Sequence, residues 1–195
     1  MEQKIIEAAR ATFLKKGFKD TNMSEIAAEV GLTRPAMHYY FRTKERLFQA
    51  VFGDILMSFL PKVSSIITSD TLLEEKIGAI ADAYLAILKE NPQLPMFLMK
   101  EAMRDLDGFV QMALGINISQ AGNNVFNALE SEIEAGKIRR VPIIEIFYTF
   151  YGLIAMPFLT MPIASHIFGR EQIDELLNER WRSHVVRHMM LLLEP

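Results

Sequence analysis

The stretch from Asn22 to Lys44 constrains the fold of this chain more than any other. Its pattern predicts two short helices joined by a tight turn. Ile26, Ala27 and Val30 recur at spacings suited to one helix face, and Gly31 follows them. Glycine is favoured directly after a helix because a left-handed backbone is cheapest without a Cβ. Two helices around a glycine-containing turn are the helix-turn-helix pattern.

Capping residues stand at the expected ends of these helices. Asn22 can cap the first helix, with Glu25 three residues later as its capping-box partner. Thr33 can cap the second helix, and Pro35 falls in its first turn, where a missing N–H does no harm. Thr43 can cap a third helix. The stretch therefore carries local start and stop signals for each helix.

The second helix exposes unusual side chains. Met37 and Phe41 are four residues apart and are expected to face inward. The outward set combines hydroxyl, imidazole and guanidinium groups, which suit phosphates and base edges: Thr33, Arg34, Ala36, His38, Tyr39 and Tyr40. The alternative is a helical hairpin inside a core, with the tyrosines half-buried. The residues alone leave both interpretations open, because this geometry also occurs in proteins that bind no DNA.

The segment from about Ile5 to Phe52 resembles the DNA-binding domain of the TetR family of bacterial transcriptional regulators. The matching pieces are Phe13, Gly17-Phe18, Thr21, Ile26-Ala27, Gly31-Leu32-Thr33, His38-Tyr39-Tyr40-Phe41 and Lys44-Glu45-Arg46-Leu47. His38 departs from the usual Tyr and Pro35 from the usual Gly or Ala, which bears on base preference and not on the fold. The resemblance covers about a quarter of the chain and raises the DNA-binding interpretation above the alternative.

The resemblance implies a set of DNA contacts on and beside the second helix. Arg34 and His38 are the predicted contacts to base edges. Tyr39 and Tyr40 are better suited to phosphates, as is Lys44 at the start of the next helix. The full predicted set is Thr33, Arg34, Pro35, Ala36, His38, Tyr39, Tyr40 and Lys44.

Charge and composition agree with a DNA-binding head on a larger body. Residues 1–50 carry nine Lys/Arg and six Asp/Glu, giving +3, whereas residues 51–195 carry twelve and eighteen, giving −6. A basic segment on an acidic chain favours localised phosphate binding. The chain has no Cys, which excludes disulfides and cysteine nucleophiles and fits a reducing cytoplasm. Its charged amino terminus does not resemble a secretory signal.

Apolar periodicity predicts an all-α chain of about nine helices, with no strand-like alternation. We expect a three-helix helix-turn-helix DNA-binding domain over residues 1–48 and a helical ligand-binding and dimerisation domain over residues 49–195. The expected later helices cover residues 44–67 with a kink or end near Pro61, then 71–90, 92–105, 109–135, 143–168 and 171–193. Asp107-Gly108 is the predicted turn before the helix at 109.

The twenty residues between Glu145 and His166 carry no charge. They satisfy the length test for a membrane span. Pro157, Pro162 and the lack of positive flanks favour a helix buried on all sides, and no membrane association is predicted. The last helix supplies one covering face, and the resemblance implies a four-helix bundle with a second copy. The prediction is a homodimer through residues 143–193.

The resemblance also implies a small-molecule pocket in the body, and the sequence favours an apolar or aromatic effector. The predicted ligand contacts are flexible or aromatic: Met99, Met103, Phe109, Met112, Phe126, Phe147 and Tyr151. Ordinary core packing is the alternative for each of them. The expected function is a ligand-responsive regulator that binds a near-palindromic double-stranded DNA operator. The resemblance implies a repressor, because repression is the usual role in this family. The other candidates are a helical small-molecule-binding module without DNA contact and a membrane-associated helical protein.

No enzyme signature is present. The sequence has no Gly-rich phosphate loop and no nucleophile elbow. His184 and His188 have the spacing of a metal pair on a helix, but no third ligand is evident. We therefore predict no catalytic residues, no metal and no cofactor.

Overall fold

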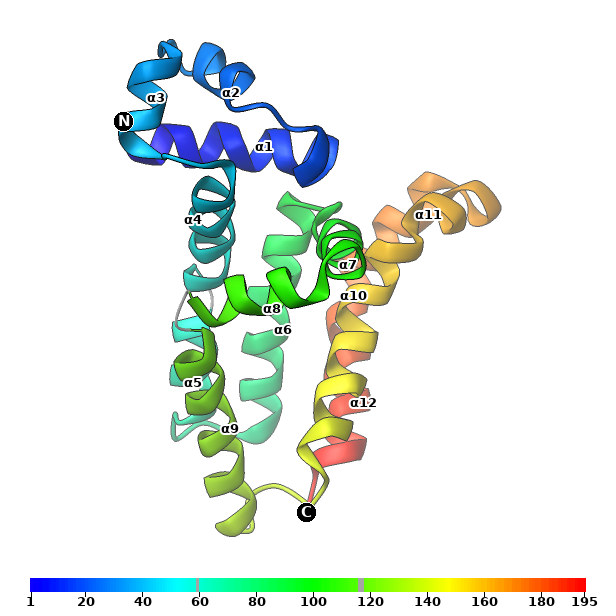
Figure 1. Cartoon of the computed structure of the whole chain (residues 1–195). Helices are drawn as coiled ribbons and strands as arrows, with labels where there is room; N and C mark the ends of the chain where they lie inside the picture. The colour runs from blue at the N-terminus through cyan, green and yellow to red at the C-terminus, as the bar shows by residue number, and fades with distance from the viewer. Residues whose placement is uncertain (59, 116–117) are drawn as a thin grey trace. The chain divides into compact units, whose positions relative to one another are not determined.

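The computed structural model describes residues 1–58, 60–115 and 118–195, with side chains outside residues 112–121 (Figure 1). All regular elements in these ranges are helices, as the sequence predicts. Contacts divide the chain into two compact units, residues 1–58 with 97–119 and residues 59–96 with 120–195. The predicted boundary at residue 48 separates the DNA-binding residues from the ligand-binding and dimerisation residues, and it remains a prediction.

The first unit holds the amino-terminal helices and two later ones. Its elements are α1 (Glu2–Asp20), α2 (Met23–Glu29), α3 (Arg34–Tyr40), α4 (Lys44–Met57), most of α7 (Leu94–Arg104) and α8 (Leu106–Gly115). The second unit holds α5 (Leu60–Ile67), α6 (Leu73–Glu90), most of α9 (Ile118–Glu134), α10 (Ile143–Phe168), α11 (Arg170–Glu175), a π-helical turn (Leu176–Arg180) and α12 (Trp181–Leu193).

The core of the first unit forms where the apolar faces of α1 to α4 meet. Phe13 of α1 and Met37 of α3 are fully buried. The rings of Phe13 and Phe18 stack at 6.0 Å, and Phe48 of α4 meets both edge-on at 5.1 Å. Phe18 therefore packs back onto Phe13, past the end of the helical geometry at Gly17. This aromatic cluster ties the end of α1 to α4.

The predicted capping residues act as expected. The Asn22 side chain accepts the N–H of Ser24, and Gly31 has a left-handed φ of +72°. The N–H groups of Gly31 and Leu32 donate to the α2 carbonyls of Ala28 and Ala27, which completes a Schellman motif.

The remaining two capping predictions concern Thr33 and Thr43. Thr33 accepts the Ala36 N–H and Thr43 accepts the Arg46 N–H. The Glu25 carboxylate, expected to complete a capping box, forms an ion pair with Lys16.

The expected helix over 44–67, with its kink or end near Pro61, corresponds to α4 and α5, and residue 59 between them lies outside the described residues. Pro61 is in the first turn of α5, where proline is tolerated. The predicted turn at Asp107-Gly108 is wrong. Both residues lie in the first turn of α8, because the Asp105 carboxylate accepts the Gly108 N–H and caps that helix. The expected helix over 109–135 corresponds to most of α8 and to α9, and residues 116–117 between them lie outside the described residues.

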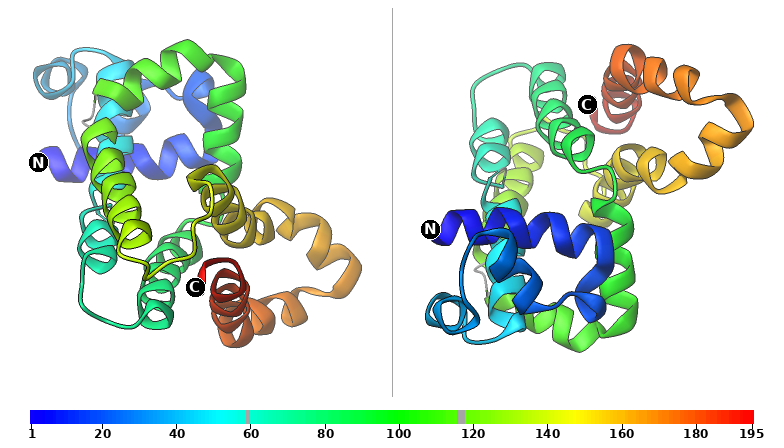
Figure 2. Two further views of the ribbon diagram at one scale, coloured as in Figure 1. Left: turned by 90° about the horizontal axis from the view of Figure 1, so that it is seen from below. Right: turned by 90° about the horizontal axis from the view of Figure 1, so that it is seen from above.

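Helix α10 covers residues 143–168 as predicted, although it contains Pro157 and Pro162. Proline at 157 lacks the N–H that would bind the Leu153 carbonyl one turn earlier. The indole N–H of Trp181 in α12 donates to that carbonyl at 2.8 Å. Figures 1 and 2 show α10 and α12 running side by side, and this hydrogen bond sets their mutual position.

Within a single chain α10 is not buried on all sides, and its burial by a partner copy remains a prediction. Only Ile146, Ile154 and Phe158 are buried along its 26 residues. The large exposed apolar side chains are Ile144, Phe147, Tyr148, Met156, Ile163, Ile167 and Phe168. One neighbour on each side covers too little of a helix that is apolar all round.

Two segments are long and apolar enough to cross a membrane by length and composition, in the part of the chain that the structure describes. These segments are Lys44–Ile67 and Ile143–Phe168. The same test is passed by core helices of soluble proteins.

Candidate nucleic-acid interface

Helix α3 presents most of the predicted DNA contacts on its outer face. Thr33, Arg34, Pro35 and His38 are exposed, Ala36 is half-exposed, and Tyr39 exposes 85% of its side chain. Tyr40 is 38% exposed and its ring meets that of Tyr39 edge-on at 5.4 Å. Met37 and Phe41 point inward, as the four-residue spacing predicts. The fold therefore holds α3 by its apolar face and leaves its polar face uncovered within the chain.

His38 has one ring nitrogen committed locally. Its Nδ1 lies 3.1 Å from the carbonyl oxygen of Arg42. A carbonyl only accepts, so this contact places a proton on Nδ1. In the neutral ring Nε2 is then an acceptor, which suits an exocyclic amino group of cytosine or adenine in a major groove.

Two further cations flank α3 and were not among the predicted contacts. Arg42 follows the helix and Arg46 lies in the first turn of α4, and both are exposed. The printed sequence places both next to residues that match the family pattern. That position was a usable signal, because phosphate contacts gather around a recognition helix.

Lys44 is engaged by the protein itself. Its ammonium donates to the main-chain carbonyls of Lys19, in the last turn of α1, at 3.1 Å and of Thr21, directly after that helix, at 3.0 Å. It also lies 4.6 Å from the centre of the Phe18 ring. A cation is favoured at the carboxyl end of a helix. Lys44 therefore positions the chain between α1 and α2, and only its third N–H is left for the predicted phosphate contact.

The carboxyl end of α1 contains a second polar anchor that sequence reasoning missed. Glu101 of α7 is buried, with 5% of the residue exposed. Its carboxylate accepts the Phe18 N–H at 3.0 Å and pairs with Arg104 at 2.8 Å. A lone Glu on an amphipathic helix gives no sign of this role in the sequence.

The predicted ligand contacts fall in both units. Met99, Met103 and Phe109 lie in the first unit, where Phe109 packs on Phe52 and the two methionines are exposed. Phe126, Phe147 and Tyr151 lie in the second unit. The Met112 side chain lies outside the described residues. A pocket in this set remains a prediction.

Tyr84 and Tyr151 anchor an aromatic cluster in the second unit. Their hydroxyl oxygens are 2.8 Å apart, and their rings meet edge-on with a centroid distance of 5.6 Å. Phe147 lies 4.6 Å from Tyr151, and Phe150 lies 5.2 Å from Tyr84. Burial raises the pKa of both phenols, so both stay neutral at physiological pH. The cluster is chemically suited to an apolar or weakly polar ligand.

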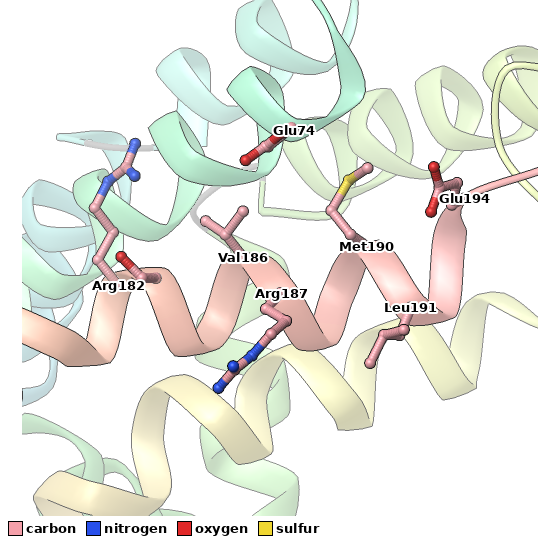
Figure 3. Close-up of a pocket in the computed structure, with 8 residues that line it drawn as sticks. Glu74, Arg182, Val186, Arg187, Met190, Leu191 and Glu194 are labelled. Atoms are coloured by element: carbon pink, nitrogen blue, oxygen red, sulfur yellow. The ribbon is translucent and has the colours of Figure 1, made fainter.

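The pocket shown in Figure 3 lies between α6 and α12 and holds about 420 Å³. None of the predicted ligand contacts lines it. Val186 and Met190 give it a small apolar floor, and the charged residues Glu74, Arg182, Arg187 and Glu194 surround them. This mixture does not match the apolar effector site that the sequence predicts.

The His184–His188 pair has no metal-site geometry around it. The two rings lie 4.3 Å apart and His184 stacks on Trp181 at 4.8 Å. Among the residues that the structure describes, no group of three His, Cys, Asp or Glu side chains could hold a metal ion. The pair belongs to the aromatic packing of α12.

Comparisons with known proteins agree with this geometry. The family model for bacterial regulatory proteins of the TetR family matches residues 5–51. The HTH-type transcriptional regulator YdgC of Bacillus subtilis is 33% identical over 39% of this chain, and the repressor BepR of Brucella suis is 37% identical over 25%. These matches span only 36% and 23% of the two relatives' own lengths.

Solved structures match over the whole chain. The regulator FadR of Bacillus subtilis, crystallised with stearoyl-CoA, superposes with a TM-score of 0.74 and covers 97% of both chains at 17% identity. That identity supports a shared fold alone.

The exposed α3 on its buried helix-turn-helix scaffold agrees with these matches. Residues 5–51 are similar to the DNA-binding domain of the TetR family of bacterial transcriptional regulators. The superposition shows that the rest of the chain shares the helical fold of FadR.

Proposed function

We propose that the protein is a ligand-responsive repressor that binds a near-palindromic operator as a homodimer. The observation that carries the proposal is the outer face of α3, with Tyr39 exposed to 85% beside Arg34 and His38. Exposed tyrosines with hydrogen-bonding tips and an arginine are expected at a groove and phosphate surface. Repression is supported by the similarity to BepR, which is a transcriptional repressor.

Dimerisation is supported by the uncovered apolar surface of α10. Ile144, Tyr148, Ile163 and Ile167 are each more than half exposed. A contiguous exposed apolar surface marks a contact site rather than a solvent surface. A two-fold contact through residues 143–193 gives two recognition helices, which read half-sites about 34–36 Å apart and require a near-palindrome.

The effector is a small apolar molecule that contacts the aromatic cluster of the second unit. Tyr84, Phe147, Phe150 and Tyr151 supply apolar surface with a neutral hydroxyl pair. The stearoyl-CoA bound to the structural neighbour FadR makes a long acyl chain the first effector to try. An effector that fits one helix arrangement shifts the population and releases the operator.

Selection from a random DNA pool tests the DNA-binding part. The expected product is a near-palindromic sequence bound with a Kd of about 10⁻⁸ M or tighter at physiological salt. Retention that falls with salt but enriches no sequence would contradict an operator-binding role. Stearoyl-CoA is then titrated against the complex, with octanoyl-CoA as a matched short-chain control that carries the same head group. Release by the long chain alone supports an acyl effector. Release by neither assigns the effector to another apolar class.

Sedimentation without detergent tests the dimer and, at the same time, the absence of membrane association. A dimer at micromolar concentration is expected. A monomer under these conditions would contradict the proposed subunit contact. Insolubility that detergent relieves would contradict the absence of membrane association.

A further inference from the structure

The carboxyl end of α1 contains a break, which the Thr21 hydroxyl bridges by donating to the Gly17 carbonyl and which partners from other helices also hold. Gly17 has φ 81° and ψ 170°, so helical geometry is interrupted one residue before Phe18. The left-handed φ is accessible to glycine without strain. The interruption leaves the Phe18 N–H available to an acceptor outside the helix, and the acceptor is Glu101 Oε1 at 3.0 Å.

The segment after the break is held from two different helices. From α7, Glu101 accepts the Phe18 N–H and Arg104 lies over the Phe18 ring at 5.0 Å. From α4, Lys44 lies over the same ring and donates to the carbonyls of Lys19 and Thr21. Both anchors lie within the first unit. The segment they hold leads directly into α2 and thus into the helix-turn-helix.

The two oxygens of the Glu101 carboxylate have different donors. Oε1 accepts the Phe18 N–H, and Oε2 pairs with Arg104 at 2.8 Å. The Glu101 side chain is 7% exposed, whereas that of Arg104 is 43% exposed. Water therefore replaces the Phe18 N–H poorly, and loss of this donor leaves a buried oxygen unsatisfied.

Helix α7 also carries two predicted effector contacts. Met99 and Met103 flank Glu101 in the sequence and are 51% and 81% exposed. Residues 94–96 of α7 belong to the second unit and the rest to the first. A ligand that engages these methionines would act on the helix that carries the carboxylate.

We propose that Glu101 is a latch: by accepting the Phe18 N–H it holds the break at Gly17 and positions the helix-turn-helix for specific DNA binding. This inference rests on the proposed function, because it requires an operator. Glu101 is a positioning residue, since it acts on α3 through the end of α1 and contacts no DNA.

Two substitutions separate the latch from a purely structural role. Glu101→Met keeps the side-chain volume and removes the acceptor. Glu101→Gln keeps an oxygen that can accept the Phe18 N–H. Glu101→Met is expected to weaken selected-operator binding about tenfold or more, with binding to unrelated DNA unchanged. Glu101→Gln is expected to bind the operator with a Kd within about threefold of that of the original chain. Operator binding at the original strength in Glu101→Met, or equal losses in both variants, would overturn the latch.

Glu132→Gln is the matched control. Glu132 forms a buried ion pair with Lys76 at 2.6 Å in the second unit, far from α1 in the sequence. Its loss should lower thermal stability and leave operator affinity unchanged. If Glu132→Gln weakens operator binding as much as Glu101→Met does, loss of any buried charge has the same effect. That result would also overturn the proposal.

Hydrogen exchange in the unaltered chain keeps the test independent of whether the variants fold. Coupling is reciprocal, so a latch that strengthens operator binding must itself be strengthened by the operator. Selected operator should slow exchange of the Phe18 amide more than that of the Leu85 amide in α6. Equal slowing would count against the latch. If no operator can be selected, the proposed function fails first, and that failure is distinct from a bound operator with an unaffected Phe18 amide.

Discussion

Helices α3 and α10 both expose large side chains, but the chemistry of the two surfaces differs. On α3 the exposed Tyr39 and Tyr40 end in hydroxyls and stand among Arg34, Arg42 and Arg46. On α10 the large exposed side chains are Ile, Met, Phe and Tyr, and none of them carries a charge. Phosphates form hydrogen bonds with hydroxyl and guanidinium groups, whereas an apolar surface is stabilised by contact with another apolar surface. Exposure alone therefore does not identify a partner; the polar atoms at the tips of the side chains do.

Charging the α10 surface should give the largest effect. Ile163→Asp with Ile167→Asp places two carboxylates at the proposed subunit contact, where burying an unpaired charge is strongly unfavourable. The dimer Kd should rise more than about 100-fold in sedimentation equilibrium, since about 3 kcal/mol corresponds to that change. Leu72→Asp, at a position 72% exposed outside α10, is the control and should leave the dimer intact. An unchanged dimer in the double variant would remove α10 from the interface.

Removing the guanidinium from α3 tests the other surface. Arg34→Ala should weaken selected-operator binding by about 1–3 kcal/mol and relax preference at particular base pairs. The measurement is the Kd together with a repeated selection from random DNA. Lys62→Ala, an exposed cation in α5, controls for loss of one positive charge. A selected sequence identical to that of the original chain would show that Arg34 does not read bases.

Lys44 and Arg42 should separate a positioning cation from a phosphate contact. Lys44→Met removes two hydrogen bonds to main-chain carbonyls, so unfolding free energy should fall by about 1–3 kcal/mol in urea titrations. Arg42→Ala should leave stability within about 0.5 kcal/mol and reduce the salt dependence of DNA binding. If Lys44→Met changes only the salt dependence, its main-chain contacts are unimportant.

The hydrogen bond from Trp181 to the Leu153 carbonyl should show a specific dependence on Pro157. Trp181→Phe should cost about 1 kcal/mol of unfolding free energy, since it removes the donor of a part-buried carbonyl. With Pro157→Ala the helix regains an N–H for that carbonyl, so the same Trp181→Phe change should cost less. Equal costs in the two backgrounds would assign the effect to packing of the indole ring.

The smallest expected effect is a pH dependence from His184. Burial lowers the pKa of His184, and the positive charges of His188 and Arg187 lower it further. The unfolded chain then binds the proton more readily than the folded chain, so folding stability should decline as the pH falls below about 6.5. Melting temperature across pH 5–8 should show a shallower decline in His184→Gln. His38→Gln, on the exposed face of α3, is the control.

Several local features were readable from the residues themselves. Asn22, Gly31, Thr33 and Thr43 start or stop helices in the structure as the sequence predicts. Met37 is buried because its spacing from Phe41 gives α3 an inward face. These features depend on neighbours within about four residues, which is why a pattern in the sequence reveals them.

Other features depend on partners far away in the chain. Glu101 binds Phe18 across 83 positions, and Trp181 binds Leu153 across 28. Lys44 matched the family pattern for its place beside the recognition helix, but its two carbonyl partners follow from how α4 meets the end of α1. The start of α8 was misplaced because a cap at Asp105 outweighed the turn signal of Asp107-Gly108.

The sequence by itself determined that this chain is helical, that residues 22–44 form a helix-turn-helix, and that one helix is too apolar for a single covering neighbour. Short-range periodicity and capping chemistry are sufficient for those conclusions. Only the tertiary structure decided that Glu101 and Lys44 jointly hold the end of α1, and that α10 remains exposed. Such contacts join residues that are distant in the chain, and their existence depends on where packing brings whole helices.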